Sequence, residues 1–337
     1  MPALRTEITE IVTGLGTLGV DDPDDVFVSR PPAALRNVDD DTWQRLLDAR
    51  SDRTHHGEFL AAWNNGRALF RAVDGLRGRP PVVVEWKGGH RDPGDDVVPS
   101  DLRIDHVYLV SCKYLSRVLH NAAPQALFDR CLTGGQGRRN DANWFDVVAP
   151  AQHQRLYQLV RRAHGGGLDL PERVTALSST QRKELRTQIP RDWSEECVDA
   201  YRDLAEAASA GSATRWTDGL RTERERTAML WRLLRLSAAP YFVLGTGPSD
   251  SLRIRVATPW DWRRAFDLRH FEVEPEGTGQ ARVAWRARVR RREDGADLEV
   301  AGHVEVRWSH GRFGGLPEAK VYLDTPHHRV PGYFPLA

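Results

Sequence analysis

Hydrophobic and polar positions change their period several times along the first third of the chain. Residues 58–73 place apolar side chains at helical spacing, which predicts one amphipathic helix. The β-branched run at 82–86 predicts a short strand, and 102–104 and 107–114 predict two more. Residues 115–131 return to helical spacing, interrupted by one proline. This part of the chain is therefore expected to follow the order helix, strand, strand, strand, helix.

The period of the hydrophobic positions also divides the remaining sequence. An acidic stretch at 1–55 predicts short helices near its start and at 42–49, and most of 151–240 has helical periodicity. From residue 241 the period becomes two, which predicts strands at 241–244, 252–256, 266–273, 281–289, 298–308 and 320–323. We therefore expect four consecutive segments, namely an acidic helical segment (1–55), a mixed-sheet core (56–150), a helical region (151–240) and a β-rich region (241–337). The expected fold class is α/β, in the wider sense that includes α+β.

Composition excludes several classes of protein. The 337 residues carry 48 Lys+Arg against 47 Asp+Glu, for a net charge of +1, and 40% of them are hydrophobic. That balance excludes a disordered chain, and no uncharged apolar run is long enough to predict a membrane span. The start of the sequence has no basic stretch followed by an apolar one, so no secretory signal is predicted. The three cysteines, Cys112, Cys131 and Cys197, form no CxxC pair, which favours a cytoplasmic location without structural disulfides or zinc.

Lysine is scarce in this chain. Only four of the 48 basic residues are lysine, at positions 87, 113, 183 and 320. Codon composition is the ordinary explanation of such a bias. Arginine serves equally well at most solvated positive positions, so a lysine that is kept points mildly to a place where a compact ammonium group matters.

One group of residues in the predicted core carries candidate chemistry. Asp101 begins the second predicted strand, and Ser111 and Lys113 lie two residues apart on the third. Residues i and i+2 of a strand point to the same face, so Ser111 and Lys113 project together, and Asp101 meets that face if the strands are antiparallel neighbours. An acid beside a lysine suits a divalent metal ion, Mg²⁺ or alternatively Mn²⁺, and an attacking water. Glu58, on the preceding helix, is a further carboxylate that can face the same place.

This arrangement resembles the core of the PD-(D/E)xK nuclease superfamily, in the S-x-K form of some type II restriction endonucleases. The resemblance covers roughly residues 57–130. It implies a restriction-endonuclease-like mixed-sheet core, Mg²⁺-dependent hydrolysis of DNA phosphodiester bonds and a role in restriction or phage defence. It makes Asp101, Ser111, Lys113 and Glu58 the catalytic residues, with Asp101 as the metal-binding acid.

Ser111 departs from the pattern of the family, because many members have Glu or Asp at that position. Glu58 or Glu85 could supply the second metal ligand, or the site could bind one ion rather than two. The implied partner is double-stranded DNA, no membrane is implied, and a homodimer is compatible with the resemblance. A non-catalytic nucleic-acid-binding or scaffold subunit that kept the fold is the alternative, and the substitution at Ser111 keeps it open.

Other interpretations of the same residues stay open. Asp105 is a rival to Asp101, although its place in a predicted turn favours a structural role. Glu85-Trp86-Lys87 is a second acid-x-lysine tripeptide, either the catalytic pair or an accessory ligand from the first strand. An Asp before a strand is most often a turn residue, and a Ser-x-Lys most often belongs to a solvated face. No GxGxxG motif follows a predicted strand, and the GxxxxGK[ST], HExxH and GxSxG motifs of phosphate-binding loops, zinc proteases and serine hydrolases are absent from the sequence.

Candidate DNA contacts lie in the β-rich region. Residues 281–292 hold six arginines and no acid, and Arg286, Arg288 and Arg290 share one face of the predicted strand. This stripe is either a DNA-binding surface or a solvated face paired with acids. The polar loop after the next strand offers Arg307, Ser309, His310 and Arg312, whose side chains suit phosphates and base edges. The run 260–264, Trp-Asp-Trp-Arg-Arg, suits packing or base stacking.

Overall fold

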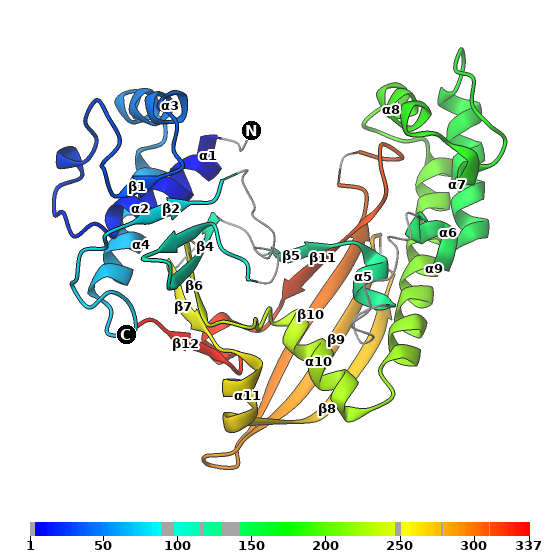
Figure 1. Ribbon diagram of the computed structural model, residues 1–337. Helices are drawn as coiled ribbons and strands as arrows, with labels where there is room; N and C mark the ends of the chain where they lie inside the picture. Colours follow the sequence, from blue (N-terminus) through cyan, green and yellow to red (C-terminus); the bar gives the residue numbers. More distant parts are fainter. Residues whose placement is uncertain are drawn as a thin grey trace. The chain divides into compact units, whose positions relative to one another are not determined.

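The structure is a computed structural model, and it describes residues 4–88, 98–114, 118–129, 142–246, 251–277, 279–309 and 311–337. The chain forms two compact units, each built from separate stretches of sequence. Unit 1 contains residues 1–116, 236–265 and 327–337, and unit 2 contains residues 117–235 and 266–326. Helices and mixed sheets occur together, so the expected α/β class is confirmed (Figure 1).

Unit 1 is organised by a seven-stranded mixed sheet in the order β1-β2-β3-β4-β6-β7-β12. Its strands are β1 (Leu35–Arg36), β2 (Val84–Trp86), β3 (Leu102–Ile104), β4 (Tyr108–Tyr114), β6 (Tyr241–Thr246), β7 (Ser251–Val256) and β12 (Tyr333–Pro335). Strands β2, β3 and β4 form an antiparallel meander, and β6 lies beside β4 in the parallel direction. The three strands predicted within 82–114 are thus confirmed, and they are neighbours in one sheet.

The helices of unit 1 supply the apolar layer against this sheet. They are α1 (Leu4–Glu7), the π-helical turn η1 (Ile8–Val12), α2 (Thr13–Gly16), η2 (Pro23–Asp25), α3 (Asp40–Ser51), α4 (His56–Arg71), α11 (Pro259–Ala265) and η4 (His327–Arg329). Asp39 caps α3 by accepting a hydrogen bond from the Thr42 backbone N–H at 2.7 Å. Gly66 of α4 permits close packing, because a Cβ there would lie 2.1 Å from the Thr13 carbonyl oxygen.

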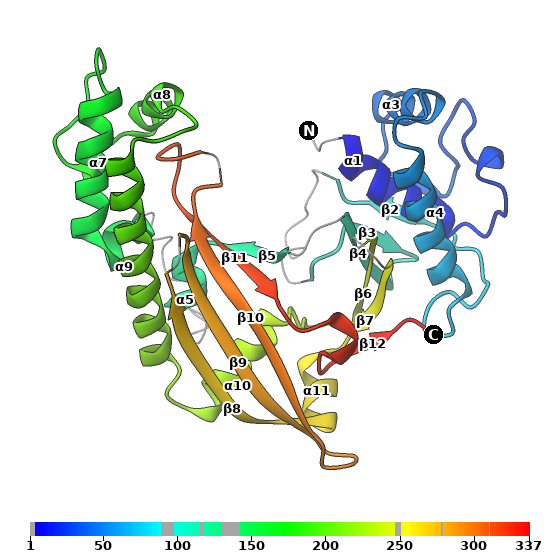
Figure 2. The same cartoon turned by 180° about the vertical axis from the view of Figure 1, so that it is seen from behind.

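Unit 2 contains a five-stranded antiparallel sheet in the order β5-β11-β10-β9-β8. The strands are β5 (Val118–Ala122), β8 (Phe266–Glu276), β9 (Ala281–Arg291), β10 (Asp297–Arg307) and β11 (Glu318–Leu323). Figure 2 shows the long, twisted strands β8, β9 and β10 from behind. Alternate residues of these strands are buried, which gives the sheet one apolar and one polar face.

The helices of unit 2 pack on the second sheet and on one another. They are α5 (Pro124–Phe128), α6 (Trp144–Val148), α7 (Pro150–His164), η3 (Val174–Ala176), α8 (Ser179–Gln188), α9 (Glu195–Gly219) and α10 (Glu223–Leu233). The long helix α9 contacts β8 and β9, and Trp216 on α9 meets Phe271 on β8 edge to face at 6.3 Å. Among the described helices, none is long and apolar enough to cross a membrane.

The structure corrects two expectations about organisation. Residues 115–131 are not one helix, because 118–122 form β5, which pairs with β11, and the proline at 124 then begins α5. The boundaries of the four consecutive segments also differ from the two units. Pairing of β6 with β4 brings residues 236–265 into the unit that contains the N-terminal segment. Such non-local pairing leaves no mark on the local periodicity.

Candidate functional site

Asp101 and Ser111 meet as the strand pattern predicts. Asp101 immediately precedes β3, where its backbone N–H donates to the Val110 carbonyl at 2.8 Å. Its carboxylate Oδ2 accepts hydrogen bonds from the Cys112 backbone N–H at 2.6 Å and from the Ser111 hydroxyl at 3.2 Å. Ser111 is 2% exposed. The serine that replaces an acid in the family pattern therefore holds the metal-binding candidate Asp101 in a fixed orientation.

Lys113 lies one strand-period beyond Ser111 and is half-buried. It pairs in register with Gly245 of β6. A Cβ at Gly245 would lie 2.9 Å from the Lys113 Cβ and 2.6 Å from its carbonyl oxygen. Gly245 thus lets β6 approach β4 closely beside Lys113. Lys113 lies on the same strand, β4, as the residues that donate hydrogen bonds to Asp101.

A helical carboxylate that sequence reasoning missed is Glu10. It lies on η1, is half-buried, and its Oε2 accepts a hydrogen bond from the Trp86 indole N–H at 2.6 Å. Trp86 ends β2, the strand next to β3, so Glu10 reaches the sheet from the helical layer. The signal available in the sequence was a glutamate inside a short helix whose neighbours Ile8, Ile11 and Val12 are all apolar.

The buried thiol of Cys112 feels the charges of several of these groups. Burial is the main reason why the pKa of Cys112 lies well above its ordinary value, and the carboxylates of Asp101 and Glu10 raise this pKa further. A hydrogen bond with Thr13 and the charge of Lys113 act in the opposite direction. The charges of Asp101, Glu10 and Lys113 therefore all act on this buried thiol.

Glu58 is engaged in a different group. It lies in the first turn of α4, where Arg5 Nε is 3.4 Å and His55 Nδ1 is 3.5 Å from its Oε1. Its side chain is 13% exposed. The helix that precedes the sheet in sequence thus places this carboxylate in an ion-pair group with Arg5 and His55.

Glu85 is also occupied by other partners. Its two carboxylate oxygens accept hydrogen bonds from Arg103 Nε and Nη2 at 2.6 and 2.8 Å, and His106 Nδ1 lies 3.1 Å away. The Arg103 hydrogen bonds lower the pKa of Glu85, against the opposing effect of burial. The described contacts therefore make Glu85 a member of a cross-strand ion pair.

Asp105 has the structural role expected of a turn residue. Its Oδ1 accepts from the backbone N–H groups of Val82 and Val83 at 2.8 and 3.1 Å, and its φ is +47°. It follows β3, whereas Asp101 precedes it. Lys87 is 5% exposed, and its backbone N–H donates to the Asp101 carbonyl at 2.9 Å. The tripeptide 85–87 therefore neighbours the site through the backbone of Lys87.

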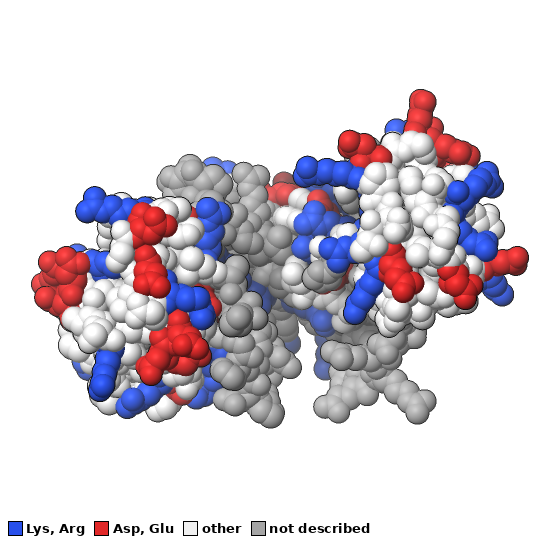
Figure 3. All heavy atoms as spheres, turned by 90° about the horizontal axis from the view of Figure 1, so that it is seen from above, with Lys and Arg blue, Asp and Glu red and all other residues white. Residues whose placement is uncertain are grey.

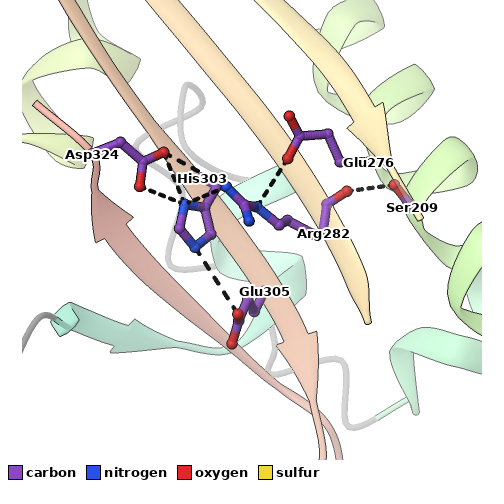
Figure 4. A network of polar contacts seen from close by, with 6 residues as sticks. All are labelled: Ser209, Glu276, Arg282, His303, Glu305 and Asp324. Atoms are coloured by element: carbon purple, nitrogen blue, oxygen red, sulfur yellow. Dashed lines mark hydrogen bonds and ion pairs between the residues drawn. The ribbon is translucent and has the colours of Figure 1, made fainter. Parts of the chain in front are cut away.

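Carboxylates from both neighbouring strands face the arginine stripe of β9. In the strand register, Arg286 lies opposite Glu272 of β8, Arg288 lies opposite Glu299 of β10, and Arg290 lies opposite an aspartate on each side. Figure 4 shows Arg282 at one end of the stripe, with its Nε 2.9 Å from Glu276 Oε2 and with His303 and Asp324 beside it. These contacts favour the alternative of a solvated face paired with acids.

The polar loop after β10 is held by its own contacts. Arg307 forms an ion pair with Glu305 at 3.3 Å, and Ser309 donates a hydrogen bond to Glu318 at 2.5 Å. The Arg312 guanidinium stacks 3.9 Å above the Trp193 ring and donates to the Arg191 carbonyl. His310 lies outside the described residues. On the face shown in Figure 3, basic and acidic side chains are interspersed, so the described residues there present no broad area of one sign.

The residues near Asp101 fit a lightly held Mg²⁺ ion better than a closed metal cage. Among the described residues, no three His, Cys, Asp or Glu side chains converge as a metal-binding group. Mg²⁺ usually keeps several waters and binds through one or two carboxylates together with substrate phosphates. Asp101 supplies one such carboxylate, and Glu10 and Lys113 add charges that act on the neighbouring Cys112 thiol.

Comparison with known proteins identifies no relative of this chain. No family model matches the chain, and the searches of curated proteins and of solved structures found no match either. The functional argument therefore rests on the site itself.

Proposed function

We propose that the protein is a Mg²⁺-dependent nuclease that hydrolyses DNA phosphodiester bonds. The observation that carries this proposal is the hydrogen bonding of Asp101 to Ser111 and Cys112, which fixes a carboxylate beside the strand of Lys113. The meander β2-β3-β4, with β6 parallel to β4, supports the resemblance to the PD-(D/E)xK nucleases, because it places the acid and the S-x-K tripeptide on adjacent strands.

Each residue has a distinct role in the proposed reaction. Asp101 would hold the ion, with Glu10 rather than Glu58 as the second carboxylate. The bound ion would neutralise charge on the phosphate. Lys113 orients the attacking water or stabilises the charge that develops on the phosphate oxygens. Ser111 keeps the Asp101 carboxylate aligned and does not itself contact the phosphate.

The biological setting in the proposal follows from the resemblance alone. Type II restriction endonucleases carry a similar S-x-K tripeptide, so we propose double-stranded DNA as the substrate and restriction or phage defence as the role. The proposal also places the protein in the cytoplasm. Cys112 and Cys197 are both buried thiols, which is consistent with that compartment.

A second candidate is a non-catalytic nucleic-acid-binding subunit with this fold. One observation favours it, namely that the described residues contain no group of three metal-ligating side chains. The two candidates differ in one property that is simple to measure, because only the nuclease changes its substrate covalently.

The test is incubation of the full chain with plasmid and phage DNA in Mg²⁺, in Mn²⁺ and in EDTA. The nuclease proposal expects cleavage with either metal, none in EDTA and none by the Asp101→Asn variant. Metal-independent DNA binding without cleavage of either DNA would replace the proposal with the non-catalytic candidate. Binding is followed in the same samples by gel shift. This distinguishes a protein that binds DNA without cleaving it from one that does not bind DNA.

A further inference from the structure

Trp260 is exposed to an unusual degree for a tryptophan in this protein. Its side chain is 64% exposed, while the other ten tryptophans, all within the described residues, are buried or half-buried. A large aromatic ring left in water costs hydrophobic free energy, and exposed aromatic rings are used at binding surfaces. The position of this ring therefore favours a partner that covers it.

The ring is presented by a short, rigid element. Thr258 and Asp261 hydrogen bond to each other at the start of α11, with Thr258 Oγ1 donating to Asp261 Oδ2 at 2.8 Å and the Asp261 N–H donating back at 3.1 Å. Trp262 is 1% exposed and donates from its indole N–H to the Pro331 carbonyl at 3.2 Å. Trp262 thus anchors α11, and Trp260 is held outside on the same turn.

The surroundings of Trp260 are basic. The Arg264 guanidinium carbon lies 4.8 Å from the centre of the Trp260 ring, and Arg263 and Arg264 are both exposed. Asp261, the acid of this helix, is engaged in the cap. A nucleobase stacks on aromatic rings and on guanidinium planes, and arginines beside the stack contact phosphates. This chemistry favours a nucleic acid over an apolar protein surface.

We propose that Trp260, with Arg264 and Arg263, is a base-stacking contact for an unpaired nucleotide of a nucleic-acid ligand. This inference deepens the proposed function, on which it rests for the class of partner. Gly245, beside Lys113, pairs with Leu252 in β7, and α11 begins beyond the opposite end of β7. At about 3.3 Å per residue the strand separates the two positions by roughly 15 Å. The contact therefore binds nucleic acid away from the bond that is cleaved.

The experiment measures binding of a single-stranded 15-nucleotide oligothymidylate and a duplex of equal length, followed by tryptophan fluorescence and by gel shift. Trp260→Leu is compared with Trp260→Phe and with Val82→Ala, which trims another exposed apolar side chain of unit 1. We expect the single strand to quench wild-type fluorescence. Trp260→Leu should remove the quenching and weaken binding about 5- to 150-fold, the range for removal of one base–aromatic stack. Trp260→Phe should lose less affinity for the single strand than Trp260→Leu, and Val82→Ala should bind it as the wild type does.

The outcomes separate this inference from the nuclease proposal. Unchanged affinity and quenching in Trp260→Leu would overturn the stacking contact. If Trp260→Leu changes sedimentation but not oligonucleotide binding, the ring belongs to a protein interface and the stacking contact is overturned. A wild type that binds neither oligonucleotide would also overturn the stacking contact. Quenching and binding by a wild type that cleaves nothing would uphold the stacking contact and reject the nuclease. For an active enzyme, Trp260→Leu should raise KM and leave kcat unchanged.

Discussion

The backbone N–H of Cys112 donates to the carboxylate of Asp101 at 2.6 Å, across the junction of two adjacent strands. Because the donor belongs to the backbone of β4, only the Asp101 side chain can rotate to release the hydrogen bond. A carboxylate held by a backbone donor is already oriented before a ligand arrives, so little ordering is needed on binding. This relationship links the S-x-K strand to its acid and is the structural basis of the proposed site.

Glu10 and Glu58 form a matched pair for testing which helix supplies the second carboxylate. We expect Glu10→Gln to reduce Mg²⁺-dependent cleavage by about 10- to 100-fold, because Glu10 is the second carboxylate of the proposed site. Glu58→Gln should keep near wild-type cleavage, since that side chain is paired with Arg5 and His55. The measurement is single-turnover cleavage at several Mg²⁺ concentrations. If Glu58→Gln instead cleaves more slowly than Glu10→Gln, Glu58 would be the second carboxylate.

Lys113 should act on the reaction rather than on binding. Lys113→Met keeps the length of the side chain and removes its charge, and we expect cleavage to fall by about 100- to 1000-fold with little change in DNA affinity. Lys183→Met is the control, because Lys183 is exposed on α8 in unit 2. Thermal unfolding of both variants checks that the fold is intact. A Lys113→Met enzyme with the wild-type rate would remove Lys113 from the mechanism.

The sequence predicts the local part of the site well and its long-range part poorly. Asp101, Ser111 and Lys113 lie within 13 positions of one another, and strand alternation suffices to bring them together. Glu10 approaches through helix–sheet packing across about 90 residues, which no periodicity records. The choice of Glu58 followed chain order, because its helix directly precedes the strands. The missed strand β5 has the same cause, since its partner β11 is far along the chain.

The arginine stripe of β9 should contribute little to DNA affinity. For duplex DNA, removing one arginine that binds a phosphate reduces the slope of log K against log[salt] by roughly 0.9. Because carboxylates of β8 and β10 face Arg286, Arg288 and Arg290, we expect the triple Gln variant to change this slope by less than about one. A salt titration with random duplex DNA checks this. A slope reduced by about two to three would show that all three arginines bind phosphates.

Glu85 should make the stability of unit 1 depend on pH. Its folded-state pKa is lowered by Arg103, so the pair stabilises the folded state above about pH 4.3 and loses that contribution as pH falls through the lowered pKa. Glu85→Gln should therefore lower the urea midpoint at neutral pH by the equivalent of about 1–2 kcal/mol. At a pH below the lowered pKa of Glu85 the two proteins should have the same stability. An equal difference in stability between the wild type and Glu85→Gln at both pH values would mean that the substitution removes packing rather than a charge interaction.

The proposed reaction requires Asp101, and not Asp105, as the metal-binding acid. Asp101→Asn keeps the shape of the side chain and its capacity to accept from Cys112, and it removes the charge that would hold Mg²⁺. Asp105→Asn is the matched control, since an amide oxygen can still accept from Val82 and Val83. The direct measurement is cleavage of plasmid DNA by both variants over a Mg²⁺ series, beside the wild type and EDTA. We expect an inactive Asp101→Asn and an active Asp105→Asn, and an active Asp101→Asn would exclude Asp101 as the metal-binding acid.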